Sequence, residues 1–153
     1  MIVSVTLNPC VDRVLFVNDL KVGDTNRVLR TEIDAGGKGV NLSRVVAELG
    51  GKTTATGFVG GGPGAYIKHV LDKQRVENDF VELMCDTRIN FSVEVAGDGP
   101  PTTSNESGTA VCESEWTLLL AKVAELSTKA SWLALGGSIP PGLPSSAFAS
   151  LIE

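Results

Sequence analysis

The stretch Ala35-Gly36-Gly37-Lys38-Gly39-Val40-Asn41 determines how the rest of this chain is interpreted. An amphipathic run follows this stretch, with apolar residues at helical spacing: Leu42, Val45, Val46 and Leu49. Gly50-Gly51 ends the run. A glycine-rich turn that leads into a helix brings backbone N–H groups close to an anion, and Lys38 adds a positive charge there. Asn41 follows one turn later on the same helix face. The stretch therefore predicts either an anion site or a tight turn that only starts a helix.

Composition limits the classes of function. The 153 residues suffice for one domain with its own core, and 42% of them are hydrophobic. The net charge is −5 and no basic stripe is present, which argues against nucleic acid and anionic membranes as partners. The three cysteines lie far apart and match neither a disulfide framework nor a zinc site, so we expect reduced thiols and no metal-binding cluster. No segment resembles a signal peptide or a membrane span, so we expect a cytoplasmic protein.

Short apolar runs alternate with amphipathic ones along the chain. Residues 2–7 and 53–59 have the β-branched character of strands buried on both faces, and 80–84 and 131–135 are further strand candidates. Helices are expected after two glycine-rich turns, the second helix ending near residue 74, then over 113–126 and after Ser145 or Ser146. The alternation predicts an α/β fold with a mainly parallel β-sheet flanked by helices.

Two segments interrupt the alternation. Residues 13–34 contain two extended runs joined by a turn, and residues 90–95 alternate between apolar and polar as a half-exposed strand does. We expect them to pair as an inserted β-sheet that forms a lid over the glycine turn. Residues 98–108 are rich in Gly, Pro, Ser and Thr and predict a loop. Asp12 follows the first strand, at the edge where open α/β sheets bind ligands, although an acid there is also a common turn residue.

Five motifs stand in order along the chain. They are Thr6-Leu7-Asn8-Pro9 with Asp12; Gly36-Gly37-Lys38-Gly39-Val40-Asn41 with Gly50 and Gly60; Gly57-Phe58-Val59-Gly60-Gly61; Thr87-Arg88-Ile89-Asn90; and Gly137-Ser138-Ile139-Pro140-Pro141-Gly142-Leu143-Pro144. Together they resemble the N-terminal half of the ribokinase-like carbohydrate kinases of the phosphofructokinase B family. The most similar branch is that of the 1-phosphofructokinases and tagatose-6-phosphate kinases. The resemblance implies a ribokinase-like half-domain over residues 1–153, with lid segments at about 12–34 and 88–106.

The resemblance also implies roles for individual residues. Asp12 would accept hydrogen bonds from sugar hydroxyls, and the Gly36-Gly37 backbone would let the sugar approach closely. The other implied substrate-binding residues are Lys38, Asn41 and Arg88 on the phosphate already present on the sugar, and Asn105 and Ser138 along the same pocket.

The implied reaction is transfer of the γ-phosphate of ATP, with Mg²⁺, to a ketohexose monophosphate to give a bisphosphate. The acceptor would be fructose 1-phosphate, tagatose 6-phosphate or fructose 6-phosphate, and the sequence does not choose among them. The resemblance further implies that the complete protein forms a homodimer through the lid strands.

The chain departs from the family pattern in one respect that matters. Family members carry the ATP site and the catalytic-base aspartate in their C-terminal half, in a Gly-Ala-Gly-Asp type motif that this sequence lacks. We therefore assign no catalytic residue, regard the chain as truncated, and expect it to be inactive alone. Two alternatives stay open: a non-catalytic sugar-phosphate-binding half or module that needs a second chain, and a nucleoside or adenosine kinase-like protein.

Overall fold

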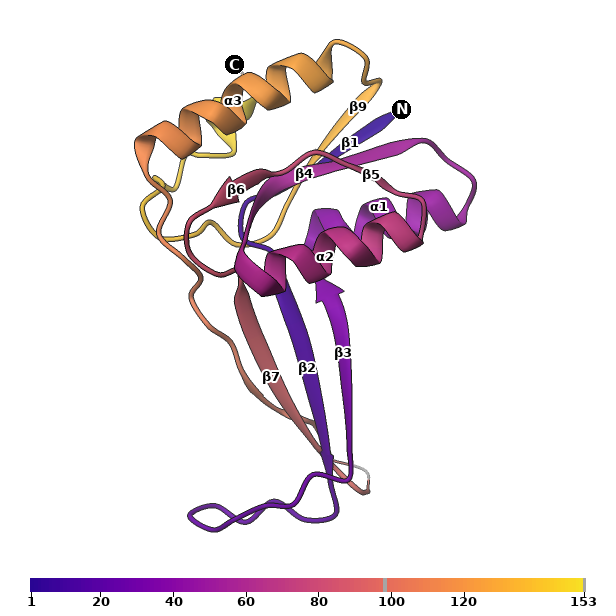
Figure 1. The fold of residues 1–153 in the computed structure, drawn as a ribbon, viewed down its shortest axis with the longest axis vertical. Coiled ribbons are helices and arrows are strands. Elements are labelled where there is room, and N and C mark those ends of the chain that lie inside the picture. Colours follow the sequence, from indigo (N-terminus) through magenta and orange to yellow (C-terminus); the bar gives the residue numbers. More distant parts are fainter. Residues whose placement is uncertain (98, 153) are drawn as a thin grey trace.

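The main sheet of the protein is parallel and has helices on both faces. The computed structural model describes residues 1–97 and 99–152, and its main sheet runs in the order β5-β4-β1-β9, with β6 beside the end of β4. The strands are β1 (Ile2–Thr6), β4 (Thr53–Gly60), β5 (Glu77–Asn78), β6 (Val81–Leu83) and β9 (Trp132–Leu135). Helices α1 (Lys38–Glu48) and α2 (Gly61–Lys73) cover one face and α3 (Glu113–Ser127) covers the other (Figure 1). The predicted α/β fold with a mainly parallel sheet is confirmed.

A second sheet extends away from the main one (Figure 1). Its order is β3-β2-β7-β8, where β2 pairs antiparallel with β3 and parallel with β7. The strands are β2 (Cys10–Val17), β3 (Arg30–Gly36), β7 (Arg88–Val95) and β8 (Thr102–Ser104). The predicted pair within 13–34 and its association with the strand at 90–95 are therefore confirmed.

The predicted loop over 98–108 is wrong in part. Thr102–Ser104 forms β8, antiparallel to β7, while Asp98 of that segment lies outside the described residues. Glycine and proline around these three residues indicate a loop, but threonine fits a pleated strand well and the edge of β7 offers unpaired backbone groups. Local composition was therefore overridden by hairpin pairing with the preceding strand β7.

Alternation along β1 divides the core between the two faces of the main sheet. Val3, Val5 and Leu7 are fully buried against the α3 side, in one cluster with Leu119 and Val123. Ser4, on the opposite face, hydrogen-bonds through its hydroxyl to Ser43 of α1 at 2.8 Å. The Ser43 hydroxyl also contacts that of Thr53 at 2.6 Å, so these buried polar side chains satisfy one another.

Helix α1 has nearly the predicted range but a different buried face. Its buried residues are Gly39, Val40 and Ser43, whereas the apolar stripe seen in the sequence is largely exposed: Leu42 38%, Val45 53% and Leu49 82%. The small residues at positions 39 and 43 allow the helix backbone to approach β1 closely. Hydrophobic periodicity alone therefore indicated the helix correctly and its packing face incorrectly.

The helix expected after Ser146 is reduced to a 3₁₀ turn, Ala149–Leu151. The apolar face expected for this helix consists of Ala147, Phe148, Leu151 and Ile152; Ala147 and Leu151 are buried, but Ile152 is 73% exposed. So short a segment gains too few i→i+4 hydrogen bonds to offset the ordering of an α-helical turn. Within residues 1–97 and 99–152, no helix has both the length and the apolar character needed to cross a membrane.

Candidate sugar-phosphate site

The glycine turn at the start of α1 is fixed against the end of β1. Gly37 has φ +124°, which a residue with a side chain rarely adopts, and a Cβ there would lie 2.8 Å from Thr6 Cγ2. The Thr6 hydroxyl accepts a hydrogen bond from the Val40 amide at 3.0 Å. The first helical bond runs from the Asn41 amide to the Gly37 carbonyl. The preceding amides of Lys38 and Gly39 have no acceptor among the described residues, and such donors attract anions at a helix start.

Asp12 lies directly against this turn. A Cβ built on Gly36 would overlap Asp12 Oδ2 and would lie 2.8 Å from Cys10 Sγ, so a side chain at position 36 would displace the carboxylate or the thiol. Asp12 Oδ1 accepts hydrogen bonds from Asn90 Nδ2 at 2.9 Å and from Cys10 Sγ at 3.3 Å. Oδ2 has no hydrogen-bond partner among the described residues. The half-buried carboxylate therefore has one oxygen held by the protein and one available to a ligand.

Cys10 acts as a neutral donor in this arrangement. Burial, together with the charge of Asp12 and the hydrogen bond to it, raises the pKa of its thiol to about 12. The thiol therefore stays protonated at neutral pH. This environment suits a hydrogen-bond donor to Asp12 and does not suit a nucleophilic thiolate.

Arg88 connects the second sheet to two other segments. Its Nε and Nη2 donate to the Asn8 carbonyl at 3.3 and 3.1 Å, and Nη1 donates to Asn90 Oδ1 at 3.2 Å and to the Glu106 carbonyl at 2.9 Å. A guanidinium has five N–H donors, so these four bonds leave one for a ligand. The phosphate contact that the family resemblance implied for Arg88 can use this N–H, whereas two-point recognition of a phosphate would require Arg88 to exchange protein acceptors for phosphate oxygens.

Ser138 and Lys38 reach the same edge of the main sheet. Asn8 Nδ2 donates to Ser138 Oγ at 3.1 Å, in the loop after β9. The exposed Lys38 side chain passes Gly136, whose added Cβ would lie 3.7 Å from Lys38 Cβ. The ends of β1 and β9, the start of α1 and the start of β7 therefore converge, as expected at the carboxyl edge of a parallel sheet.

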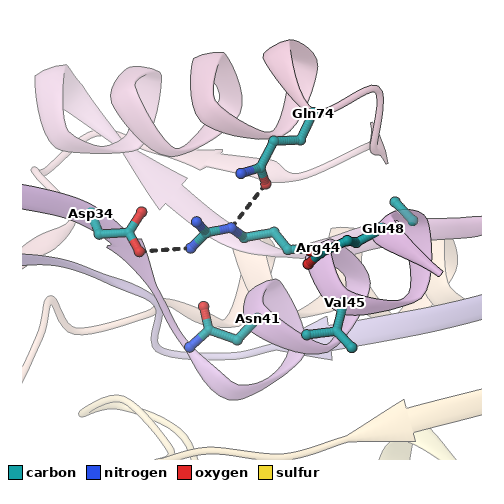
Figure 2. A pocket seen from close by; sticks show the side chains of 7 residues that line it. Asp34, Asn41, Arg44, Val45, Glu48 and Gln74 are labelled. Atoms are coloured by element: carbon teal, nitrogen blue, oxygen red, sulfur yellow. Dashed lines mark hydrogen bonds and ion pairs between the residues drawn. The ribbon is translucent and has the colours of Figure 1, made fainter.

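Asn41 and Asn105 lie outside the hydrogen-bonded group around Asp12. Asn41 lines an open cavity of about 540 Å³ beside Arg44 (Figure 2). Arg44 donates there to Asp34 Oδ2 and to Gln74 Oε1, each at 2.9 Å, so the charged groups of this cavity largely pair with one another. Asn105 is exposed, and no hydrogen bond of its side chain is found among the described residues. The geometry favours the Asp12 edge over this cavity as the reactive site, because glycine backbone, carboxylate and cations meet there.

Three contributors were not identified from the sequence: Asn8, Cys10 and Asn90. Asn8 and Asn90 stand inside the quoted motifs, and the alternation along β7 placed Asn90 on a polar face. The register that sets Asn90 opposite Asp12 is a property of the paired strands and cannot be obtained from either strand alone.

A model of the pfkB family carbohydrate kinases matches residues 5–153. The chain belongs to the pfkB family. The fold, with its parallel sheet and inserted strands, is that of the ribokinase-like kinases in this family.

Relatives of this pfkB chain include the 1-phosphofructokinase of Borreliella burgdorferi, 36% identical over 148 residues that cover 97% of this chain and 47% of the relative. Among solved structures, phosphofructokinase-2 of Escherichia coli in complex with fructose-6-phosphate is 30% identical, with a TM-score of 0.89, over 99% of this chain and 50% of the other. A possible 1-phosphofructokinase of Thermotoga maritima is 31% identical, with a TM-score of 0.90, over 99% and 49%. The pfkB chain spans about half the length of these relatives.

Proposed function

We propose that this pfkB chain supplies the acceptor-sugar site for ATP-dependent phosphorylation of a ketohexose monophosphate. The observation that carries the proposal is the Asp12 carboxylate, which lies over Gly36 with Oδ2 unpaired among the described residues. An ionised carboxylate accepts several hydroxyl donors, as a sugar presents. The similarity to 1-phosphofructokinase and to phosphofructokinase-2 supports a phosphorylated sugar as the acceptor.

The cations around the carboxylate favour a substrate that already carries a phosphate. Lys38 is exposed at the first turn of α1, where the helix dipole and unpaired amides also attract an anion. Arg88 contributes its remaining N–H on the other side of Asn8. In the proposal Ser138 contacts the sugar, and Asn41 and Asn105 line the rim of the same site.

Residues 12–34 and 88–106 form the lid in this proposal. The register places Asn90 and Asp34 on the same face of the second sheet as Asp12, and alternation adds Val14 and Ser92 to that face. A sheet that holds these residues over the sugar would exclude water, which would otherwise compete as the phosphoryl acceptor.

The proposed site concerns the acceptor sugar and not the nucleotide. Within 1–97 and 99–152, no group of three or more His, Cys, Asp or Glu side chains is placed to hold a metal ion. We therefore assign no residue to Mg²⁺ or to the ATP phosphates, and we propose that the chain alone binds the sugar phosphate without turning it over.

We also propose that the chain forms a homodimer through the second sheet. The face opposite Asp12 carries Leu15, Phe91 and Val93, and it includes the exposed Ile33 (43%) and Val95 (39%). One related structure is described as a tetrameric form of phosphofructokinase-2. Ile33→Lys or Val95→Lys should convert a dimer to a monomer in sedimentation velocity, whereas Leu49→Lys on α1 should not. A wild-type chain that sediments as a monomer at all concentrations would contradict this.

A second candidate is a sugar-phosphate-binding chain that a second polypeptide completes. The edge of the main sheet favours it: β9 pairs with β1 only, among the described strands, and Trp132 on β9 is 73% exposed. An open edge strand with an exposed tryptophan is a surface that another sheet can extend.

A calorimetric titration tests the proposed site. The chain is titrated with fructose 1-phosphate, fructose 6-phosphate, tagatose 6-phosphate, unphosphorylated fructose and adenosine. The same titrations are run on Asp12→Asn and, as a control, on Asp72→Asn at an exposed position of α2. We expect saturable binding of at least one sugar phosphate, weaker binding of fructose, and loss of about tenfold or more in affinity for Asp12→Asn only. Binding of none of the three, or of adenosine alone, would contradict the proposal.

A turnover assay tests the proposed inactivity of the chain alone and its completion by a second polypeptide. The chain is incubated with ATP, Mg²⁺ and the bound sugar phosphate, alone and with a polypeptide carrying the C-terminal half of a 1-phosphofructokinase relative. Turnover only in the mixture supports completion by a second chain. Turnover by the chain alone would show that the claim of inactivity is wrong.

A further inference from the structure

We propose that Asn90 is a positioning residue that links Arg88 to Asp12 and thereby fixes which carboxylate oxygen faces the substrate. This inference rests on the proposed function, because it concerns the same site. Nothing in the family match or in the names of the relatives assigns a role to Asn90.

The three side chains are adjacent because of strand register. Asp12 of β2 lies directly opposite Asn90 of β7, and Arg88 lies two residues before Asn90 on the same face. Asn90 Nδ2 donates to Asp12 Oδ1 at 2.9 Å, and Asn90 Oδ1 accepts from Arg88 Nη1 at 3.2 Å. The amide therefore connects the cation at the start of β7 to the carboxylate on β2.

The chemistry of the neighbours allows only one orientation of this amide. A guanidinium only donates hydrogen bonds and an ionised carboxylate only accepts them, whereas an asparagine amide has one end of each kind. The opposite orientation would place Nδ2 against the Arg88 donors and the carbonyl oxygen against Asp12. Arg88 and Asp12 thus determine the Asn90 rotamer, and Asn90 in turn restrains Asp12.

Restraint of Oδ1 leaves Oδ2 for the ligand. Oδ1 receives both the Asn90 amide and the Cys10 thiol, while Oδ2 lies beside Gly36. A carboxylate held in this way is preorganised to accept sugar hydroxyls, and a ligand need not immobilise it on binding. A side chain of the same shape without a donor would lose this effect, which distinguishes positioning from packing.

Three variants test the positioning role by affinity for the sugar phosphate that wild type binds best. Asn90→Ala removes the link and should weaken binding about tenfold. Asn90→Asp keeps the shape but replaces the donor with an acceptor, and it should weaken binding at least as much. Asn78→Ala is the control, because it removes a comparable amide hydrogen bond, from Asn78 Nδ2 to Asp72 Oδ1 at 2.8 Å, outside the lid; it should bind within about twofold of wild type. Melting temperatures of all three variants report whether the fold is retained.

A second measurement does not depend on ligand binding. The ¹H–¹⁵N resonances of the Asn90 side-chain amide should shift in Asp12→Ala and in Arg88→Ala, because each variant removes one of its partners, and should be unchanged in Asn78→Ala.

The outcomes are distinguishable. If wild type binds a sugar phosphate and Asn90→Asp binds it equally well, Asn90 only packs and the inference is wrong. If wild type binds none of the sugar phosphates, the proposed function fails, and the amide shifts alone decide whether the link exists. In either case, the inference is wrong if the resonances of the Asn90 side-chain amide are unchanged in both Asp12→Ala and Arg88→Ala.

Discussion

Gly36 and Asp12 are in contact across the antiparallel pair of β3 and β2, so closely that a Cβ on Gly36 would overlap Asp12 Oδ2. The same Cβ would lie 2.8 Å from Cys10 Sγ, on the residue paired directly with Gly36. The glycine turn and the carboxylate are therefore one structural unit. A ligand that reaches Asp12 also reaches the backbone of the turn and the start of α1.

Gly36→Ala should displace the Asp12 carboxylate from its position. We expect the affinity for the sugar phosphate to fall at least about tenfold and the free energy of unfolding to fall by about 1–3 kcal/mol, the usual range for overpacking. Gly62→Ala is the matched control, because a Cβ there meets nothing within 4 Å. Calorimetric titration and urea denaturation of both variants provide the test; a Gly36→Ala chain with wild-type affinity would show that the contact is unimportant for binding.

Substitutions of Lys38 and Arg88 should both weaken binding but should differ in their effect on stability. Arg88→Ala removes bonds to the Asn8 and Glu106 carbonyls, so we expect a loss of about 2 kcal/mol in unfolding free energy as well as weaker binding. Lys38 is exposed and forms no ion pair or side-chain hydrogen bond among the described residues. Lys38→Ala should therefore weaken phosphate binding while changing the unfolding free energy by less than about 0.5 kcal/mol. Equal destabilisation by the two variants would contradict these assignments.

Ser43→Ala should destabilise the protein although it removes only one oxygen. The Ser43 hydroxyl contacts those of Ser4 and Thr53, and Ser4 is completely buried. Its removal leaves buried hydroxyl groups without partners, for which we expect a loss of about 1–3 kcal/mol in unfolding free energy. Ser131→Ala, at an exposed position, serves as the control. Denaturant titration that finds the two variants equally stable would contradict the role of this hydroxyl cluster.

The raised pKa of Cys10 predicts that the stability of the protein depends on pH in the alkaline range. Its pKa is about 12 in the folded protein against 9.0 for an ordinary thiol, because burial and Asp12 disfavour the thiolate. Below pH 9.0 the thiol is protonated in both states, and its contribution to stability is fully present. As pH rises from 9.0 towards 12 the unfolded chain loses the proton first, so the contribution is progressively lost.

The comparison with Cys10→Ser isolates this effect, because the hydroxyl keeps a donor to Asp12 and does not ionise in that range. The difference in unfolding free energy between wild type and Cys10→Ser should be constant from pH 6 to 8 and should shift against wild type above about pH 9. A constant difference up to pH 11 would show that the Cys10 pKa is not raised.

The sequence predicted the layers of this fold well, because long apolar runs and turn residues report local structure directly. Residues 2–7 and 53–59 form the buried strands β1 and β4, and the extended runs within 13–34 pair as expected. The packing face of α1 could not be predicted, since it depends on how closely Gly39 and Ser43 let the helix approach β1. Strand β8 was missed for a similar reason, because its pairing with β7 outweighs its loop-like composition.

The candidate site, too, could be predicted only in part from the sequence. Motifs indicated Asp12, Gly36, Arg88 and Ser138, and hydrogen bonds or close contacts join these residues at one sheet edge. The occupation of the Arg88 donors by backbone carbonyls was not foreseen, nor was the link through Asn90, because both depend on strand register.

The most direct test of the central claim is a ¹H–¹⁵N chemical-shift map of the chain titrated with fructose 1-phosphate, fructose 6-phosphate and tagatose 6-phosphate. We predict that the sugar phosphate that binds perturbs the backbone amides of Asp12, Gly36 and Lys38 together with the Asn90 side-chain amide. Perturbations confined to the cavity around Arg44 and Gln74, or no perturbation by any of the three sugars, would contradict the assignment of the Asp12 edge as the sugar-phosphate site.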